Sequence, residues 1–170
     1  MTERVRRGHR LRGRRGPLRR IGAIVRVASY SLIFTVRGAK PAPRFVLLDG
    51  VRCPKLYESR ELDVAVYVLE FPEIAEHDEV KEPELGRGRL EVDEPRECRI
   101  ESVDRNYIRA TIPSYVPRPG DAGAPITQDG YVVGMLASYW TNDMLGMGPR
   151  MDVALERVAD HLRRTRSSTA

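Results

Sequence analysis

The 170-residue sequence predicts an all-β protein that ends in one α-helix. Short runs of β-branched and aromatic residues recur along most of the chain, separated by turn signals. An acidic stretch that contains prolines divides these runs into two sets. Near the end of the chain, the spacing of apolar residues changes to the period of a helix. Many short strands are typical of barrels or of a sandwich, so we expect two β lobes joined by a connector.

The first set of runs, within residues 21–72, predicts the first lobe. Asp49-Gly50 is the strongest short hairpin signal, because both residue types tolerate the positive φ of a type I′ turn. Pro72 ends the last run, because proline cannot donate a hydrogen bond to a neighbouring strand. The predicted strands are Ile21–Ala28, Ser31–Val36, Arg44–Leu48, Val51–Tyr57 and Asp63–Phe71.

Residues 73–86 are acidic and poor in strand formers, which predicts a connector between the lobes. The second set of runs then predicts a second lobe over residues 87–150, with a tight turn at Asp129-Gly130. Its predicted strands are Arg89–Val92, Cys98–Val103, Tyr107–Ile112, Ala124–Thr127, Tyr131–Ser138 and Met144–Gly148.

A helix is expected over residues 151–165, followed by a short tail at 166–170. Within Asp152–Arg164, apolar residues recur at the helical spacing i, i+3, i+4 and i+7. Asp152 is the predicted N-cap, because a carboxylate there can accept hydrogen bonds from the first turn. The residues of the apolar stripe are Leu155, Val158, Ala159 and Leu162.

The charge is distributed unevenly along the chain. Residues 1–20 contain nine arginines and one acid, whereas the whole chain has a net charge of only +5. We expect this segment to be a disordered arm, because no periodic apolar face can be buried there. Its guanidinium groups suit phosphate, but it has no aromatic residue for base stacking. The candidate nucleic-acid-binding residues are Arg4, Arg6, Arg7, Arg10, Arg12, Arg14, Arg15, Arg19 and Arg20.

Cysteine usage and hydropathy bear on location. Cys53 and Cys98 could form one disulfide at most, and we expect two reduced, buried thiols in an intracellular, reducing compartment. No run of apolar residues is long enough to predict a membrane span. Neither a cofactor nor a metal is expected.

The segment Gly120–Pro125 reads GDAGAP, which would be the nucleophile turn of a chymotrypsin-like protease if its third residue were serine or cysteine. Leu62–Val66 (LDVAV) resembles the strand that supplies the catalytic carboxylate in these enzymes. Leu145–Leu162 resembles their last strand and closing helix. Residues 21–164 therefore resemble the chymotrypsin- and trypsin-like proteases, and are similar in style to the compact proteases of positive-strand RNA viruses. The resemblance implies a trypsin-like double β-barrel.

The resemblance also implies where a catalytic site would lie. It maps the nucleophile to Ala122, whose methyl group cannot attack a carbonyl, and the carboxylate to Asp63. It maps the histidine base to Gly38, so that the imidazole is missing. The N–H groups of Gly120 and Ala122 would form an oxyanion-type turn. We expect Arg37, next to the lost base, to pair with Asp63.

These features together predict a catalytically inactive protease-like protein, or pseudoprotease, of viral origin that binds nucleic acid through residues 1–20. RNA is favoured, and coating or packaging a genome is one concrete role. The alphavirus capsid proteins are similar in arrangement, because they join a basic RNA-binding arm to a chymotrypsin-like domain. Their GDSGRPI resembles Gly120–Ile126. Other viral proteins, or a second copy of this chain, are further candidate partners.

Two other functions stay open from the sequence. The first is a viral chymotrypsin-like peptidase whose nucleophile has been changed to Ala122, with residues 131–140 and 144–148 around its specificity pocket. The second is a protein-interaction module without a nucleic-acid role, because aromatic and methionine residues are enriched at interfaces. The second lobe is rich in such residues, namely Met135, Tyr139, Trp140, Met144, Met147 and Met151.

Overall fold

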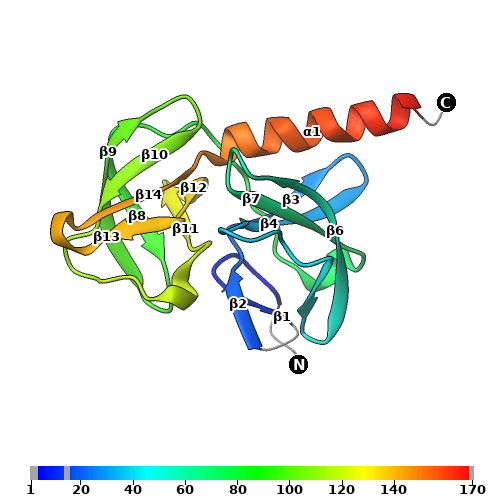
Figure 1. Ribbon diagram of the computed structural model, residues 1–170, viewed down its shortest axis with the longest axis horizontal. Coiled ribbons are helices and arrows are strands. Elements are labelled where there is room, and N and C mark those ends of the chain that lie inside the picture. Colours follow the sequence, from blue (N-terminus) through cyan, green and yellow to red (C-terminus); the bar gives the residue numbers. More distant parts are fainter. Residues whose placement is uncertain (1–3, 14–15, 169–170) are drawn as a thin grey trace.

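The computed structural model describes residues 4–13 and 16–168. Figure 1 shows two β lobes side by side, with one long helix lying across the first of them. Each lobe is a curled antiparallel sheet of seven strands. The described residues therefore confirm the prediction of an all-β double barrel with a C-terminal helix.

In the first lobe, the spatial order of the strands is β2-β1-β5-β6-β7-β4-β3. The hairpin predicted at Asp49-Gly50 forms, because β5 pairs with β6, and β3 pairs with β4 in a second hairpin. Asp49 and Gly50 have φ angles of 50° and 78°, as a type I′ turn requires. The strands are β1 (Arg10–Gly13), β2 (Gly16–Arg20), β3 (Ala23–Val27), β4 (Tyr30–Val36), β5 (Phe45–Leu48), β6 (Val51–Ser59) and β7 (Val64–Leu69).

The segment 1–20, predicted to be a disordered arm, is instead folded in its described part. Strands β1 and β2 form an antiparallel hairpin, and β1 also pairs with β5. Leu11 is fully buried, and the N–H of buried Val5 donates to the carbonyl of Ile74 at 2.8 Å. The prediction failed because a strand needs only alternate apolar residues, and Leu11 fills the core while its arginine neighbours face outward. The first lobe therefore begins at β1.

The second lobe has the strand order β12-β11-β8-β9-β10-β14-β13. The predicted turn at Asp129-Gly130 joins β11 to β12, with φ angles of 53° and 84°. Three 3-10 turns lie between strands of the chain: η1 (Pro72–Ile74), η2 (Pro119–Asp121) and η3 (Thr141–Asp143). The strands are β8 (Gly86–Glu91), β9 (Pro95–Val103), β10 (Tyr107–Thr111), β11 (Pro125–Gln128), β12 (Tyr131–Met135), β13 (Ser138–Trp140) and β14 (Leu145–Pro149).

The acidic connector, residues 73–86, makes backbone hydrogen bonds to both lobes. The N–H of Asp78 donates to the carbonyl of Ile24 in the first lobe at 2.7 Å. The N–H of Val132 in the second lobe donates to the carbonyl of Glu79 at 3.0 Å. The connector therefore helps to hold the two lobes together.

Helix α1 (Met151–Ser168) begins where predicted and extends beyond the predicted segment 151–165. Asp152 is not the N-cap, because it lies in the first turn, where its carboxylate binds the guanidinium of Arg150 at 2.7 Å. The N–H of Ala154 donates to the carbonyl of Arg150 at 3.1 Å. The buried face of the helix packs against apolar residues of both lobes, and consists of Met151, Ala154, Val158 and Leu162.

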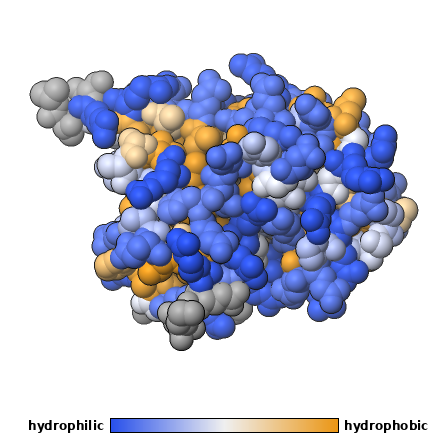
Figure 2. Space-filling model, turned by 180° about the vertical axis from the view of Figure 1, so that it is seen from behind, coloured by the Kyte–Doolittle hydropathy of each residue, from blue (hydrophilic) through white to orange (hydrophobic). Residues whose placement is uncertain are grey.

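Most of the surface seen from behind is hydrophilic (Figure 2), in keeping with a composition that is 31% charged. An apolar hollow of about 230 Å³ lies beside the outer half of α1, lined by Val27, Tyr30 and Leu162 among others. Among the described residues, no helix combines the length and the apolar character that crossing a membrane requires.

Both cysteines are buried and free, as predicted, and they lie in different lobes, Cys53 on β6 and Cys98 on β9. Burial, helped by the charge of Glu70, raises the pKa of Cys53 to about 11. Burial, helped by the charge of Glu97, raises the pKa of Cys98 to about 12. The two thiols therefore stay protonated and weakly nucleophilic at neutral pH.

Candidate functional site

The turn that resembles a nucleophile turn consists of η2 followed by Ala122 and Gly123. The N–H of Gly123 donates to the carbonyl of Leu136 at 2.7 Å, and the N–H of Ala124 donates to the carbonyl of Asp121 at 2.9 Å. Gly123 has a φ of +93°, which favours glycine. Ala122 is partly buried and packs against the apolar cluster that joins the two lobes.

This turn of the second lobe contacts the end of β2 in the first lobe. The N–H of Arg20 donates to the carbonyl of Ala122 at 2.8 Å. The hydroxyl of Thr35 donates to the carbonyl of Arg20 at 2.8 Å. A Cβ atom at Gly123 would lie 2.3 Å from that carbonyl oxygen. Residue 122, to which the resemblance maps the nucleophile, therefore lies at the junction of the lobes.

A buried ion pair supports this junction. The Nε of Arg20 lies 3.0 Å from Oδ1 of Asp121, and both side chains are only 3% exposed. Burial alone would raise the pKa of Asp121. Hydrogen bonds from the N–H of Arg118, the hydroxyl of Tyr115 and the guanidinium of Arg20 outweigh burial and lower that pKa below its usual value. Arg20 also donates to the carbonyl of Gly8 at 2.9 Å.

Arg20 is therefore not available to a phosphate, although the sequence made it a candidate for nucleic-acid binding. Sequence reasoning missed its pairing with Asp121, since 101 positions separate the two residues. The only signal was the acid that precedes Ala122 in the GDAGAP string.

Asp63 and Gly38 are brought together, as the resemblance implied. Asp63 precedes β7 with a φ of +59°. Its Oδ1 accepts a hydrogen bond from the backbone N–H of Gly38 at 2.6 Å. Tyr107 of the second lobe reaches the same turn, where its hydroxyl donates to the carbonyl of Glu61. Burial, followed by the charges of Asp63 and Glu61, raises the pKa of Tyr107.

The predicted pairing of Arg37 with Asp63 is wrong, because the guanidinium of Arg37 binds Glu58 at 2.7 Å instead. Glu58 also accepts hydrogen bonds from Lys55 at 2.6 Å and from the N–H of Ala42 at 3.1 Å. The bond from Lys55, followed by those from Ala42 and Arg37, lowers the pKa of Glu58 to about 2. Glu58 therefore holds the loop that follows Gly38.

The space above Gly38 is filled by Arg19. A Cβ atom at Gly38 would lie 2.2 Å from one terminal nitrogen of Arg19 and 2.8 Å from its guanidinium carbon. Arg19 pairs with Leu11 across the β1–β2 hairpin, and with Tyr67 it lines a small enclosed space in the first lobe. The guanidinium thus occupies the volume in which an imidazole at position 38 would begin.

A double-mutant cycle tests how firmly Arg19 is held above Gly38. We expect Gly38→Ala to cost about 1–2 kcal/mol of unfolding free energy, because the backbone has a positive φ. The atoms that the new methyl group meets belong to the end of a flexible side chain that can swing aside, so an Arg19→Ala background should lower this cost by less than about 0.5 kcal/mol. Urea unfolding of the four proteins measures the coupling. A coupling above about 1 kcal/mol would show that the guanidinium is fixed in this position.

The histidines take no part in this site within the described residues. His77 lies in the connector, where its Nε2 is 2.7 Å from the hydroxyl of buried Ser31. Desolvation, followed by the charge of Arg26, lowers the pKa of His77. His161 on α1 packs against Tyr57, with ring centroids 5.1 Å apart. No imidazole in the described ranges is hydrogen-bonded to Asp63.

A cleft of about 480 Å³ lies between residues 6–9, 76–78 and 91–95, with Arg20 also in its lining. Three arginines and four carboxylates line it, so its charges nearly cancel. Arg7 is committed there to internal ion pairs, with Glu91 at 2.6 Å and Asp78 at 2.8 Å. Over the described part of the chain, no group of histidine, cysteine and acidic side chains could hold a metal ion.

Two curled antiparallel sheets and a closing helix are the architecture of the trypsin-like double β-barrel, and solved structures of this fold match the chain. Thermobifida fusca protease A matches with a TM-score of 0.69 and 11% identity, over 90% of this chain and 95% of that one. The serine protease domain of the Sesbania mosaic virus polyprotein matches with a TM-score of 0.65 and 13% identity, over 91% and 96%.

The NSP4 proteinase from equine arteritis virus matches with a TM-score of 0.55 and 15% identity, over 84% of this chain and 72% of that one. No protein-family model matches the sequence, and no curated protein is similar to it in sequence. At these low identities, the likeness concerns the fold alone.

Proposed function

We propose that this chain is a protease-fold protein that does not hydrolyse peptides, and that it binds nucleic acid, RNA in preference, through the arginines of its N-terminal hairpin. The occupied space above Gly38 carries the first half of the proposal. Acyl transfer by this fold needs a nucleophile and a base that takes its proton. Ala122 offers neither oxygen nor sulfur, and the guanidinium of Arg19 lies where a base would begin.

Restoring single groups tests the loss of peptidase chemistry. We expect neither the wild-type protein nor Ala122→Ser to cleave a broad peptide library, because a serine without a base is a weak nucleophile. Ala122→Ser combined with Gly38→His restores both groups, and any cleavage by this variant should rise when Arg19→Ala also removes the guanidinium from the space above residue 38. Circular dichroism of each variant confirms that the fold is intact. Cleavage by Ala122→Ser alone would overturn the proposal and restore the peptidase alternative.

The exposed arginines of β1 support the nucleic-acid half of the proposal. Arg12 is exposed, and the side chain of Arg10 is 49% exposed with only a long ion pair of 3.7 Å to Asp93. Arg14 and Arg15 follow in the sequence but lie outside the described residues. Arginines on one strand can contact successive phosphates, and the counterions that they release make such binding depend on salt.

Binding to a 20-nucleotide RNA, measured by fluorescence anisotropy at several salt concentrations, tests this half. For Arg10→Ala combined with Arg12→Ala, we expect weaker binding and a salt slope reduced by about 1.4, the value for two phosphates of a single strand. The matched control is Arg87→Ala with Arg99→Ala, which removes exposed arginines of the second lobe. Equal effects of both pairs, or no binding by the wild-type protein at low salt, would contradict the proposal.

A viral setting, with genome coating or packaging as the role, forms part of the same proposal. The fold is compatible with this setting, because viral and bacterial proteases share it. An electrostatic surface that reads phosphates without reading sequence suits a genome-coating role.

A further inference from the structure

The fold places an aromatic side chain near Arg12, although residues 1–20 contain no aromatic residue. Arg12 on β1 pairs in register with Leu47 on β5, and Leu47 pairs with Arg52 on β6. Phe45 lies two residues before Leu47, so it shares the same face of β5. One row of side chains therefore crosses three neighbouring strands, with Phe45 beside it.

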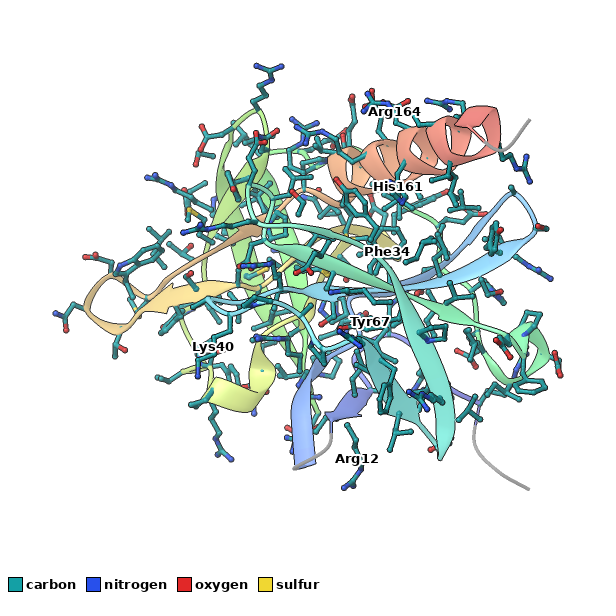
Figure 3. All side chains as sticks on the ribbon, turned by 45° about the vertical axis from the view of Figure 1, so that its right-hand side comes forward. Arg12, Phe34, Lys40, Tyr67, His161 and Arg164 are labelled. Carbon is teal, nitrogen blue, oxygen red and sulfur yellow. The ribbon has the colours of Figure 1, made fainter. Side chains whose placement is uncertain are left out.

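This face is the outer face of the first lobe. Alternate residues Leu11, Val46 and Cys53 are buried in the core, whereas Arg12 and Arg52 are exposed. Phe45 and Leu47 are half-buried between the two arginines. Figure 3 shows Arg12 pointing away from the lobe whose interior contains Phe34 and Tyr67.

The charge and geometry of this face suit a ligand that carries both negative charge and planar ring systems. The guanidinium carbon of Arg52 lies 3.8 Å from the centroid of the Phe45 ring, a stacked cation–π arrangement. Neither Arg12 nor Arg52 forms an ion pair with any described residue, and exposed Arg44 directly precedes β5. The nearest acid in the sequence of this hairpin is Asp49, at its turn.

We propose that this outer face, formed by Arg12, Phe45, Leu47 and Arg52, is a platform for single-stranded nucleic acid. The inference rests on the proposed nucleic-acid binding and names its substrate class. The arginines bind phosphates, and an unpaired base stacks on the Arg52–Phe45 pair. Aromatic rings and guanidinium planes both stack on bases, and only a single strand presents a base that is free to do so.

The test separates stacking from charge by using conservative variants. Arg52→Lys keeps the positive charge but loses the plane, and Phe45→Leu keeps the apolar volume but loses the ring. The probes are a 20-nucleotide oligouridylate that contains one 2-aminopurine, whose fluorescence reports stacking, and an RNA duplex of equal length. We expect the wild-type protein to bind the single strand more tightly and to change the 2-aminopurine signal.

Each variant should weaken single-strand binding by about tenfold, with the salt slope unchanged, and should abolish the 2-aminopurine response. The matched control is Arg96→Lys, because Arg96 lies over the ring of Tyr115 in the second lobe at 5.1 Å, and this variant should bind normally. Wild-type affinity in Arg52→Lys and Phe45→Leu, or tighter binding of the duplex, would overturn the platform and leave the proposed function standing. Absence of all RNA binding would overturn both.

Discussion

Asp121→Ala is expected to lower the free energy of unfolding by about 3 kcal/mol, because it removes the buried partner of Arg20 and leaves only the exposed carboxylate of Asp93, 3.1 Å from the guanidinium. Both side chains of the Arg20–Asp121 pair are 3% exposed, so water replaces the lost carboxylate poorly. The substitution also removes the acceptor of hydrogen bonds from Tyr115 and from the N–H of Arg118. Urea unfolding followed by circular dichroism measures the change.

The matched control for this prediction is Arg10→Ala, which removes an arginine of the same hairpin from a long, exposed ion pair with Asp93. Its effect should stay below about 1 kcal/mol, as for other surface pairs. A cost of 1 kcal/mol or less for Asp121→Ala would mean that the buried pair does not support the lobe junction.

The Asp121 carboxylate should also affect how the stability of the protein depends on pH in acid. The pKa of Asp121 is lowered in the folded protein, so its carboxylate stabilises the fold fully above the ordinary value of 3.8. That contribution is lost as the pH falls through the folded pKa. The difference in unfolding free energy between wild type and Asp121→Asn should therefore shrink as the pH falls below the folded pKa of Asp121.

Gly123→Ala is expected to destabilise the protein by about 3 kcal/mol or more. The new Cβ would lie 2.3 Å from the carbonyl oxygen of Arg20 and 2.9 Å from the hydroxyl of Thr35. The first of these is backbone and cannot rotate away, and overpacking of this kind costs about 1–3 kcal/mol. The positive φ of +93° adds about 1–2 kcal/mol for any residue with a Cβ atom. Thermal and urea unfolding both report the loss.

Gly120→Ala is the matched control within the same motif. A Cβ at Gly120 meets nothing within 4 Å. We expect a change smaller than about 1 kcal/mol, of either sign, because a compatible glycine-to-alanine change mainly restricts the unfolded chain. Similar costs at Gly120 and Gly123 would show that the turn is not packed against the first lobe.

These two predictions share one physical basis. The turn with the GDAGAP sequence packs its glycine against the backbone of β2 and anchors its aspartate on Arg20. Both neighbours of the residue that the resemblance assigns as nucleophile therefore take part in joining the two lobes. This structural role can persist whether or not the turn carries a nucleophile.

Local features of the fold could be predicted from the sequence because their causes are local. The turns at Asp49-Gly50 and Asp129-Gly130 follow from residue types that tolerate positive φ. The closing helix follows from its apolar spacing, although its buried face is shifted toward Met151 and Ala154. The resemblance to protease sequences mapped Asp63 and Gly38 to one site, and in the structure these two residues are hydrogen-bonded.

The predictions that failed concern charged residues and their partners. An excess of arginine over residues 1–20 concealed the strand pattern, because one buried Leu11 is enough to hold β1 in the core. Arg37 lies next to Gly38 in the chain, yet its guanidinium pairs with Glu58 on β6. Neither the hydrophobic pattern nor a motif in the sequence indicated that these two residues would meet.

The sequence by itself determined the alternation of strands and turns, the single closing helix and the absence of a nucleophilic side chain at residue 122. Only the tertiary structure decided the role of each arginine: Arg20 buried against Asp121, Arg19 over Gly38, and Arg12 across β5 from Arg52. The reason is physical. Turns and periodicity arise from interactions between close neighbours in the chain, whereas the partner of a charged side chain depends on which strands become adjacent when the sheets curl into barrels.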